Sequence, residues 1–160
     1  MLRDSFLVHL VPAWFTKLSA KVVRRPKLYV VDSGLAACSL GASANLPDDP
    51  RQPLGSLMET FVAMEVLRQL SWGRERPTLW HFRDRSGVKV DLVLEHPDGR
   101  VVGIEVKASS SVGHSDFGGL RFLADRLGDC FHDGVVTHTA PASVVFGPNL
   151  SAIPISALWE

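Results

Sequence analysis

Two acidic residues and a lysine occupy two adjacent runs of alternating apolar residues, and together they could hold a divalent metal ion. Asp91 lies in the first run, and Glu105 and Lys107 lie in the second. Carboxylate oxygens are ligands that suit Mg²⁺ and Mn²⁺, and such an ion can neutralise a phosphate and lower the pKa of a bound water. The chemistry indicated is metal-dependent phosphodiester hydrolysis, with the Val106 carbonyl as a further ligand and Lys107 orienting or deprotonating the attacking water.

The spacing of these residues predicts that they meet. The segment Pro97-Asp98-Gly99 separates the two runs and is a strong signal for a β-hairpin. A loop centred on Asp98 pairs Asp91 directly with Glu105. Strand alternation assigns the opposite face to three apolar neighbours of Asp91, namely Val90, Leu92 and Leu94. Because two carboxylates facing each other across a ladder repel unless a cation lies near them, this register favours a metal site.

A Glu-x-Lys triplet also occurs on strands that have no catalytic role. Glu105 and Lys107 by themselves could be an ordinary solvated ion pair. The combination of the turn, the register and Asp91 favours the metal site over this alternative, because several independent features have to agree.

Glu59 is a fourth candidate because it lies near the start of a helical apolar pattern, residues 54–70, from which its carboxylate could lean over the metal. The alternative is a capping box, in which Ser56 caps the helix and Glu59 bonds back to the Ser56 amide.

The remaining patterns predict the elements that would position these side chains. Period-two alternation indicates strands at residues 79–83, 88–95 and 100–108, and an apolar run indicates another at 131–136. A second helix is expected at 115–127, a short strand at 143–146 and a helical turn at 156–159. Earlier in the chain, a strand at 28–31 and a short helix capped by Asp32 precede a polar, proline-rich linker at 45–53. This order predicts an α/β sandwich with a mixed central sheet flanked by helices.

The charge balance restricts how the chain could contact nucleic acid. Lys plus Arg and Asp plus Glu are equal at 17 each, so any DNA contact has to be local. The candidates come from a basic stretch near the N-terminus and from one predicted strand: Lys17, Lys21, Arg24, Arg25 and Arg83. The alternatives are a solvated loop for the stretch and a solvated sheet edge for the strand residue.

Length and composition set further expectations. The 160 residues suffice for one complete domain and a short extra piece, which we place at residues 1–27 as a basic extension. Cys38 and Cys130 show neither zinc nor disulfide spacing and are expected to be buried thiols. No apolar stretch reaches the ~18 residues of a membrane span and no signal peptide is present, so a cytoplasmic protein without membrane contact is expected.

Four segments carry a resemblance to a known family: Pro26-Lys27-Leu28-Tyr29-Val30-Val31-Asp32-Ser33-Gly34-Leu35-Ala36, Leu54-Gly55-Ser56-Leu57-Met58-Glu59-Thr60-Phe61-Val62, Val90-Asp91-Leu92-Val93 and Ile104-Glu105-Val106-Lys107-Ala108-Ser109. With these, the chain resembles the domain of unknown function that follows the ATPase domain in many prokaryotic AAA+ proteins. That family looks like a PD-(D/E)xK nuclease with the restriction-endonuclease-like fold.

The resemblance implies specific roles. Carried over residue by residue, it gives Glu59, Asp91, Glu105 and Lys107 as catalytic residues, with Mg²⁺ or Mn²⁺ as cofactor. It also implies that residues 1–27 end a winged-helix-like segment and that residues 28–160 form the nuclease-like domain. An ATPase domain of the parent protein or of a homologue would be a partner, since this chain has no phosphate-binding loop ending in Lys and Ser or Thr.

Three functions therefore stand beside one another. The leading one is a metal-dependent phosphodiesterase acting on DNA. The second is a noncatalytic DNA-binding or regulatory module of an ATPase with the same fold. The third is an interaction domain that forms homo-oligomers, which the apolar segment 152–159 would permit.

Overall fold

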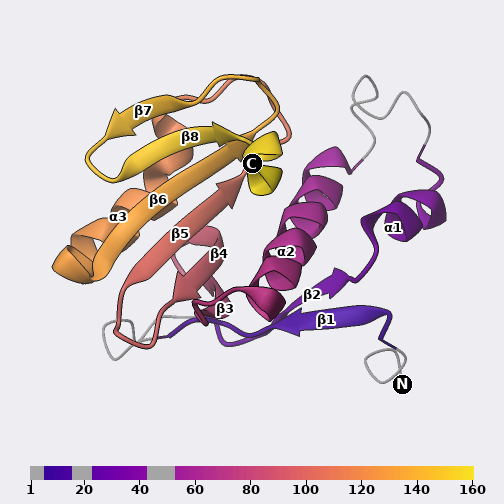
Figure 1. Cartoon of the computed structure of the whole chain (residues 1–160), viewed down its shortest axis with the longest axis horizontal. Coiled ribbons are helices and arrows are strands. Elements are labelled where there is room, and N and C mark those ends of the chain that lie inside the picture. Colours follow the sequence, from indigo (N-terminus) through magenta and orange to yellow (C-terminus); the bar gives the residue numbers. More distant parts are fainter. Residues whose placement is uncertain (1–5, 16–22, 43–52) are drawn as a thin grey trace.

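A six-stranded mixed sheet with a long helix on each face forms the centre of the protein. The computed structural model describes residues 6–15, 23–42 and 53–160 (Figure 1). The sheet has the strand order β3-β4-β5-β6-β8-β7. Its members are β3 (Thr78–Arg83), β4 (Lys89–Glu95), β5 (Val101–Val106), β6 (Phe131–His138), β7 (Val144–Gly147) and β8 (Leu150–Pro154). The predicted α/β class with a mixed sheet and flanking helices is confirmed.

The pairing of the strands changes from antiparallel to parallel between β5 and β6. β3, β4 and β5 are joined as antiparallel hairpins, and β6 then pairs parallel with β5. The crossover between β5 and β6 runs through the 3₁₀ helix η2 (His114–Phe117) and α3 (Gly118–Leu127). A parallel pair requires such a crossover because the chain has to return to the same end of the sheet before the next strand begins.

The two long helices cover opposite faces of the sheet (Figure 1). α3 packs Leu120 and Leu123 into a core with Phe131 and Val136 of β6. On the other face, α2 (Leu54–Trp72) buries Val62 and other apolar side chains in a second core with strands β3, β4 and β5. Burial of this apolar surface on both faces is the main favourable contribution to folding.

The N-terminal residues that the structure describes run along the edge strand β3. β1 (Val8–Val11) and β2 (Lys27–Val30) form a separate antiparallel pair and are followed by α1 (Ser33–Ser39). The Trp14 amide donates to the His81 carbonyl, the Val23 amide donates to the Arg83 carbonyl, and the Trp14 side chain is buried in the core below α3. These contacts hold residues that precede position 27 against the edge of the same sheet.

Most predicted elements are present, and two strands were missed, β1 and β8. β8 inserts between β6 and β7, so β7 forms the sheet edge instead of following β6 directly. Only part of the apolar segment 152–159 is buried within the fold, since Ala152 is buried in β8 whereas Trp159 contacts the Phe61 ring but is 54% exposed. The expectation of buried thiols is wrong, because Cys38 and Cys130 are both exposed. No helix within the described ranges is long and apolar enough to cross a membrane.

A β-bulge at the site overturns one expectation about strand alternation. Trp80 pairs with Val93 but Phe82 pairs with Val90, so two steps along β3 correspond to three along β4. The extra residue lies in β4 between these pairs, and a bulge of this kind reverses the alternation of faces. As a result Val90 packs in the core below α3, whereas Leu92 packs in the core below α2.

Candidate active site

Asp91 and Glu105 lie on neighbouring strands at the point where β4 and β5 separate. The predicted register is confirmed, because the ladder ends with Leu92 paired to Ile104, one position before the two carboxylates. The Val106 amide donates to Asp91 Oδ2 at 3.2 Å. In a continued antiparallel ladder that amide would bond to a β4 carbonyl, so the Asp91 side chain replaces the strand where the bulge interrupts it.

Two lysines that the sequence analysis did not assign to the acidic pair neutralise Asp91. Lys89 Nζ lies 2.7 Å from Asp91 Oδ1 and 3.7 Å from Glu105 Oε2. Lys27 Nζ reaches the same Asp91 oxygen from β2, at 3.3 Å. Asp91 is only 2% exposed, so these cations offset a charge that would otherwise be expensive to bury.

Glu59 joins this group through β2 and not through a helix cap. The Tyr29 hydroxyl donates to Glu59 Oε1 at 2.6 Å, and Lys27 Nζ lies 2.6 Å from the same oxygen. Helix α2 begins at Leu54 with Pro53 as its N-cap, which excludes the capping box at Ser56. Lys27 thus bridges Glu59 and Asp91 and connects the start of α2 to β4.

The two facing carboxyls differ strongly in proton affinity. Burial, and next the charge of Asp91, raise the pKa of Glu105 from 4.5 to about 8. Burial also opposes ionisation of Asp91, but the hydrogen bond from Glu105 and the ammonium groups of Lys27 and Lys89 outweigh it and lower its pKa to about 2. Near neutral pH the pair therefore holds one proton, which sits on Glu105.

Lys107 points to a different partner from the one the Glu-x-Lys pattern suggested. Its Nζ lies 2.8 Å from Asp116 Oδ1, on the 3₁₀ helix η2. Lys107 is close enough to Glu105 to favour its ionised form, although burial and Asp91 have the larger effect. Lys89 therefore forms the ion pairs with Asp91 and Glu105 that the pattern had suggested for Lys107.

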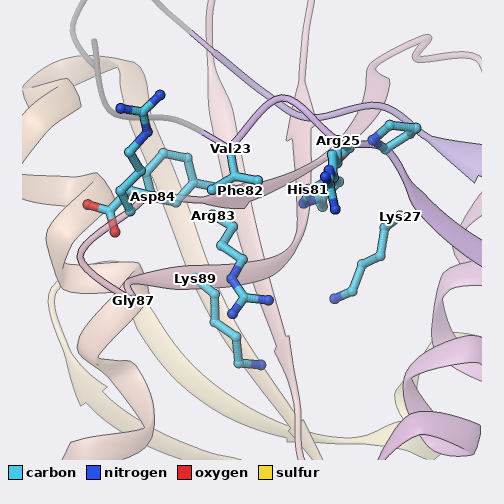
Figure 2. A pocket seen from close by; sticks show the side chains of 11 residues that line it. Val23, Arg25, Lys27, His81, Phe82, Arg83, Asp84, Gly87 and Lys89 are labelled. Carbon is cyan, nitrogen blue, oxygen red and sulfur yellow. The ribbon is translucent and has the colours of Figure 1, made fainter.

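A basic pocket adjoins the acidic pair on the side of β3. It has a volume of about 560 Å³ and contains two of the predicted nucleic-acid-binding residues, Arg25 and Arg83. Figure 2 shows the cationic ends of Lys27, Arg83 and Lys89 directed into the same space. Arg24 is instead stacked over the Phe15 ring, 5.2 Å from its centroid. The other two predicted residues, Lys17 and Lys21, lie outside the described residues.

His81 lines this pocket, and its imidazole forms a hydrogen bond with the Arg25 backbone. Its Nε2 lies 3.0 Å from the Arg25 carbonyl, and the side chain is 6% exposed. Burial lowers the pKa of His81, although the bond to that carbonyl partly opposes the effect. The imidazole is therefore neutral at neutral pH and fixes Arg25 in place without adding charge.

The donor set of the acidic pair fits a hard divalent cation in type, but it is small. Among the described residues, no three His, Cys, Asp or Glu side chains are arranged to hold a metal ion. A metal at Asp91 and Glu105 would need backbone carbonyl or water ligands to complete its coordination, as Mg²⁺ commonly does. It would also have to replace the proton on Glu105, since metal-binding carboxylates are ionised.

The sequence does contain a pattern that places the two unassigned lysines, Lys27 and Lys89, beside other residues of the site. Lys89 stands two positions before Asp91, and Lys27 stands two positions before Tyr29, so strand alternation alone places each pair on a common face. The sequence does not reveal that β2 approaches α2 and β4, because that contact joins segments 30 to 64 residues apart.

Comparison with known proteins identifies two matched regions. Residues 54–158 match a family model described as a domain of unknown function, DUF4143, and residues 1–46 match a second one, DUF8612. Two uncharacterized proteins, Mb2031c of Mycobacterium bovis and Rv2008c of Mycobacterium tuberculosis, are each 31% identical to this chain over 110 residues. These matches cover 69% of the chain but 24% of each relative, so the chain spans about a quarter of their length.

Proposed function

The chain belongs to the DUF4143 family of domains of unknown function, and from the geometry of its acidic pair we propose that it hydrolyses phosphodiester bonds of DNA with the help of Mg²⁺ or Mn²⁺. The observation that carries the proposal is the buried pair of Asp91 and Glu105, held face to face beside a pocket rich in lysine and arginine. Such a pair is unfavourable for stability alone, and strongly shifted pKa values in a cleft are typical of functional sites.

We take the fold to be restriction-endonuclease-like. Its support is the arrangement of two antiparallel hairpins followed by a parallel crossover through α3, with the acidic residues where β4 and β5 separate. The chain would be the C-terminal part of a longer cytoplasmic protein with an AAA+ ATPase domain. The relatives, which are about four times as long as the matched region, leave room for that partner.

In this proposal Asp91, Glu105 and the Val106 carbonyl hold the metal, and Glu59 assists through a water. The bound ion supplies positive charge to the scissile phosphate and lowers the pKa of its water. Lys89 contacts both carboxylates and is placed to orient the attacking water. Lys107 has that role only if it leaves Asp116.

The test is Mn²⁺ binding measured by calorimetry, with cleavage of labelled DNA followed in the same samples at pH 8.5. Asp91→Asn and Glu105→Gln are expected to lose both activities, since each removes a ligand. Glu75→Gln is the matched control, because Glu75 is exposed and lies outside the site. A folded wild-type protein that binds neither Mn²⁺ nor Mg²⁺ contradicts the proposal.

One observation favours a second function, a noncatalytic DNA-binding or regulatory module of an ATPase. Lys27 and Lys89 already neutralise Asp91, and Lys107 is paired with Asp116, so the group is balanced electrostatically with a single proton on Glu105. DNA binding that persists in EDTA, with no metal binding and no cleavage, would select this function.

A further inference from the structure

The basic pocket beside the acidic pair has cations without carboxylate partners. Within the described part of the chain, no carboxylate forms an ion pair with Arg25, Arg83 or Arg85, all of which are exposed and line the pocket. The pocket's acidic member, Asp84, is 7% exposed. Unpaired arginines in a concave site attract phosphate, which the guanidinium group can bind through two parallel hydrogen bonds.

Asp84 does not neutralise these arginines because its own turn uses its oxygens. Asp84 Oδ1 accepts from the Ser86 and Val88 amides at 2.9 and 3.0 Å, and both carboxylate oxygens accept from the Ser86 hydroxyl at 2.7 Å. Figure 2 shows the Asp84 carboxylate directed away from the cationic ends of Arg83 and Lys89. These hydrogen bonds fix the backbone of the turn, so the side chains of Arg83 and Arg85 project from a rigid segment.

A second cavity adjoins the basic pocket on the side of Glu105. That cavity, of about 390 Å³, is lined by Glu105, Lys107, Ser115 and Asp116, and it shares Gly87 and Lys89 with the basic pocket. Lys89 lies between the two hollows and contacts both carboxylates. A linear polyanion can occupy both cavities and pass over Glu105, the neighbour of Asp91, whereas a free phosphate fills only one of them.

We infer that these two cavities form the path of one single strand of nucleic acid, whose phosphates bind at Arg25, Arg83 and Arg85. This deepens the proposed function by naming the class of substrate, and the hydrolytic part rests on that proposal. The acidic pair is 2% and 5% exposed, so a scissile phosphate has to descend toward it. A flexible single strand bends into such a site, whereas duplex DNA resists bending over roughly 150 base pairs.

The experiment is binding of a fluorescein-labelled oligonucleotide of mixed sequence, measured by anisotropy in EDTA at several salt concentrations. Wild type is compared with the double variant Arg83→Gln/Arg85→Gln. The matched control is Arg74→Gln/Arg76→Gln, which removes the same charge from exposed residues outside both cavities. Each lost phosphate contact should reduce the slope of log K against log salt by about 0.7, so the pocket variant should lose about 1.4 and the control little.

A second arm compares the single strand with a blunt duplex of the same sequence, and the single strand is expected to bind more tightly. An unchanged slope in the pocket variant, or tighter binding of the duplex, overturns the inference. Because EDTA removes any metal, binding is read independently of hydrolysis. A strand that binds in this path while Mn²⁺ binding and cleavage are absent from the wild type refutes the proposed hydrolysis and leaves the strand path in place.

Discussion

Asp91 and Glu105 face each other across the β4–β5 hairpin with 2% and 5% of their surfaces exposed, and they share one proton near neutral pH. Two ionised carboxylates that are buried this deeply and face each other would repel strongly. The arrangement is compatible with folding because Lys27 and Lys89 supply positive charge on one side and Glu105 retains its proton.

This pair gives the protein a defined dependence of stability on pH. Folded Glu105 keeps its proton up to about pH 8, whereas its ordinary pKa is 4.5. Between those values the folded chain binds more protons than the unfolded chain, so the contribution of Glu105 to stability is full below pH 4.5 and falls as the pH rises toward 8. Asp91 has the opposite sign, since its lowered pKa contributes stability that is lost as the pH falls from 3.8 to about 2.

Glu105→Gln should remove the alkaline decline. The amide keeps the shape of the protonated carboxyl, so urea unfolding midpoints of the variant should vary less between pH 5 and pH 9 than those of wild type. Asp125→Asn, at an exposed position without an ion pair in the described part of the chain, should follow the wild-type curve. Parallel curves for wild type and Glu105→Gln would show that Glu105 is ionised throughout this range.

Lys27 is predicted to stabilise the fold by bridging two carboxylates. Its Nζ lies 2.6 Å from Glu59 Oε1 and 3.3 Å from Asp91 Oδ1. Lys27→Met should lower the free energy of unfolding by about 1–3 kcal/mol, because the carboxylates lose a charged partner while partly buried. The double variant Lys27→Met/Glu59→Gln should recover part of this loss in urea unfolding, and strictly additive effects would argue against the bridge.

Tyr29 provides a spectroscopic test of the contact between β2 and α2. It is the only tyrosine in the sequence, so tyrosinate absorbance reports on this residue alone. Burial, and next the charge of Glu59 and the hydrogen bond to it, raise the pKa of Tyr29 far above its ordinary value of 10.0. An ultraviolet titration should therefore show no ionisation until the protein unfolds at alkaline pH. Ionisation of the folded protein near pH 10 would contradict the contact.

The sequence was sufficient to predict the acidic pair because the turn around Asp98 sets the register locally. It was insufficient for the bulge in β4, which depends on the pairing of β4 with β3. β8 was missed because a short segment ending at Pro154 carries little periodicity, and its position between β6 and β7 follows from long-range pairing. The partner of Lys107 was likewise decided by a residue on another element, Asp116.

The adjacent glycines Gly118 and Gly119 at the start of α3 offer a matched test of how this helix is seated against the site. A Cβ at Gly119 would lie 2.0 Å from the Lys89 carbonyl oxygen, whereas a Cβ at Gly118 would meet nothing within 4 Å. Gly119→Ala has to push α3 away from β4, and we expect it to lower the free energy of unfolding by about 2–4 kcal/mol. Gly118→Ala reduces the conformational freedom of the unfolded chain and raises helix propensity, so it should be neutral or stabilise by about 0.5–1 kcal/mol.

Urea unfolding of both variants measures the difference in stability. Because Lys89 contacts Asp91 and lines both cavities, Gly119→Ala should also weaken oligonucleotide binding in EDTA. Equal stability of the two variants would mean that α3 does not pack against the Lys89 backbone as closely as the structure has it.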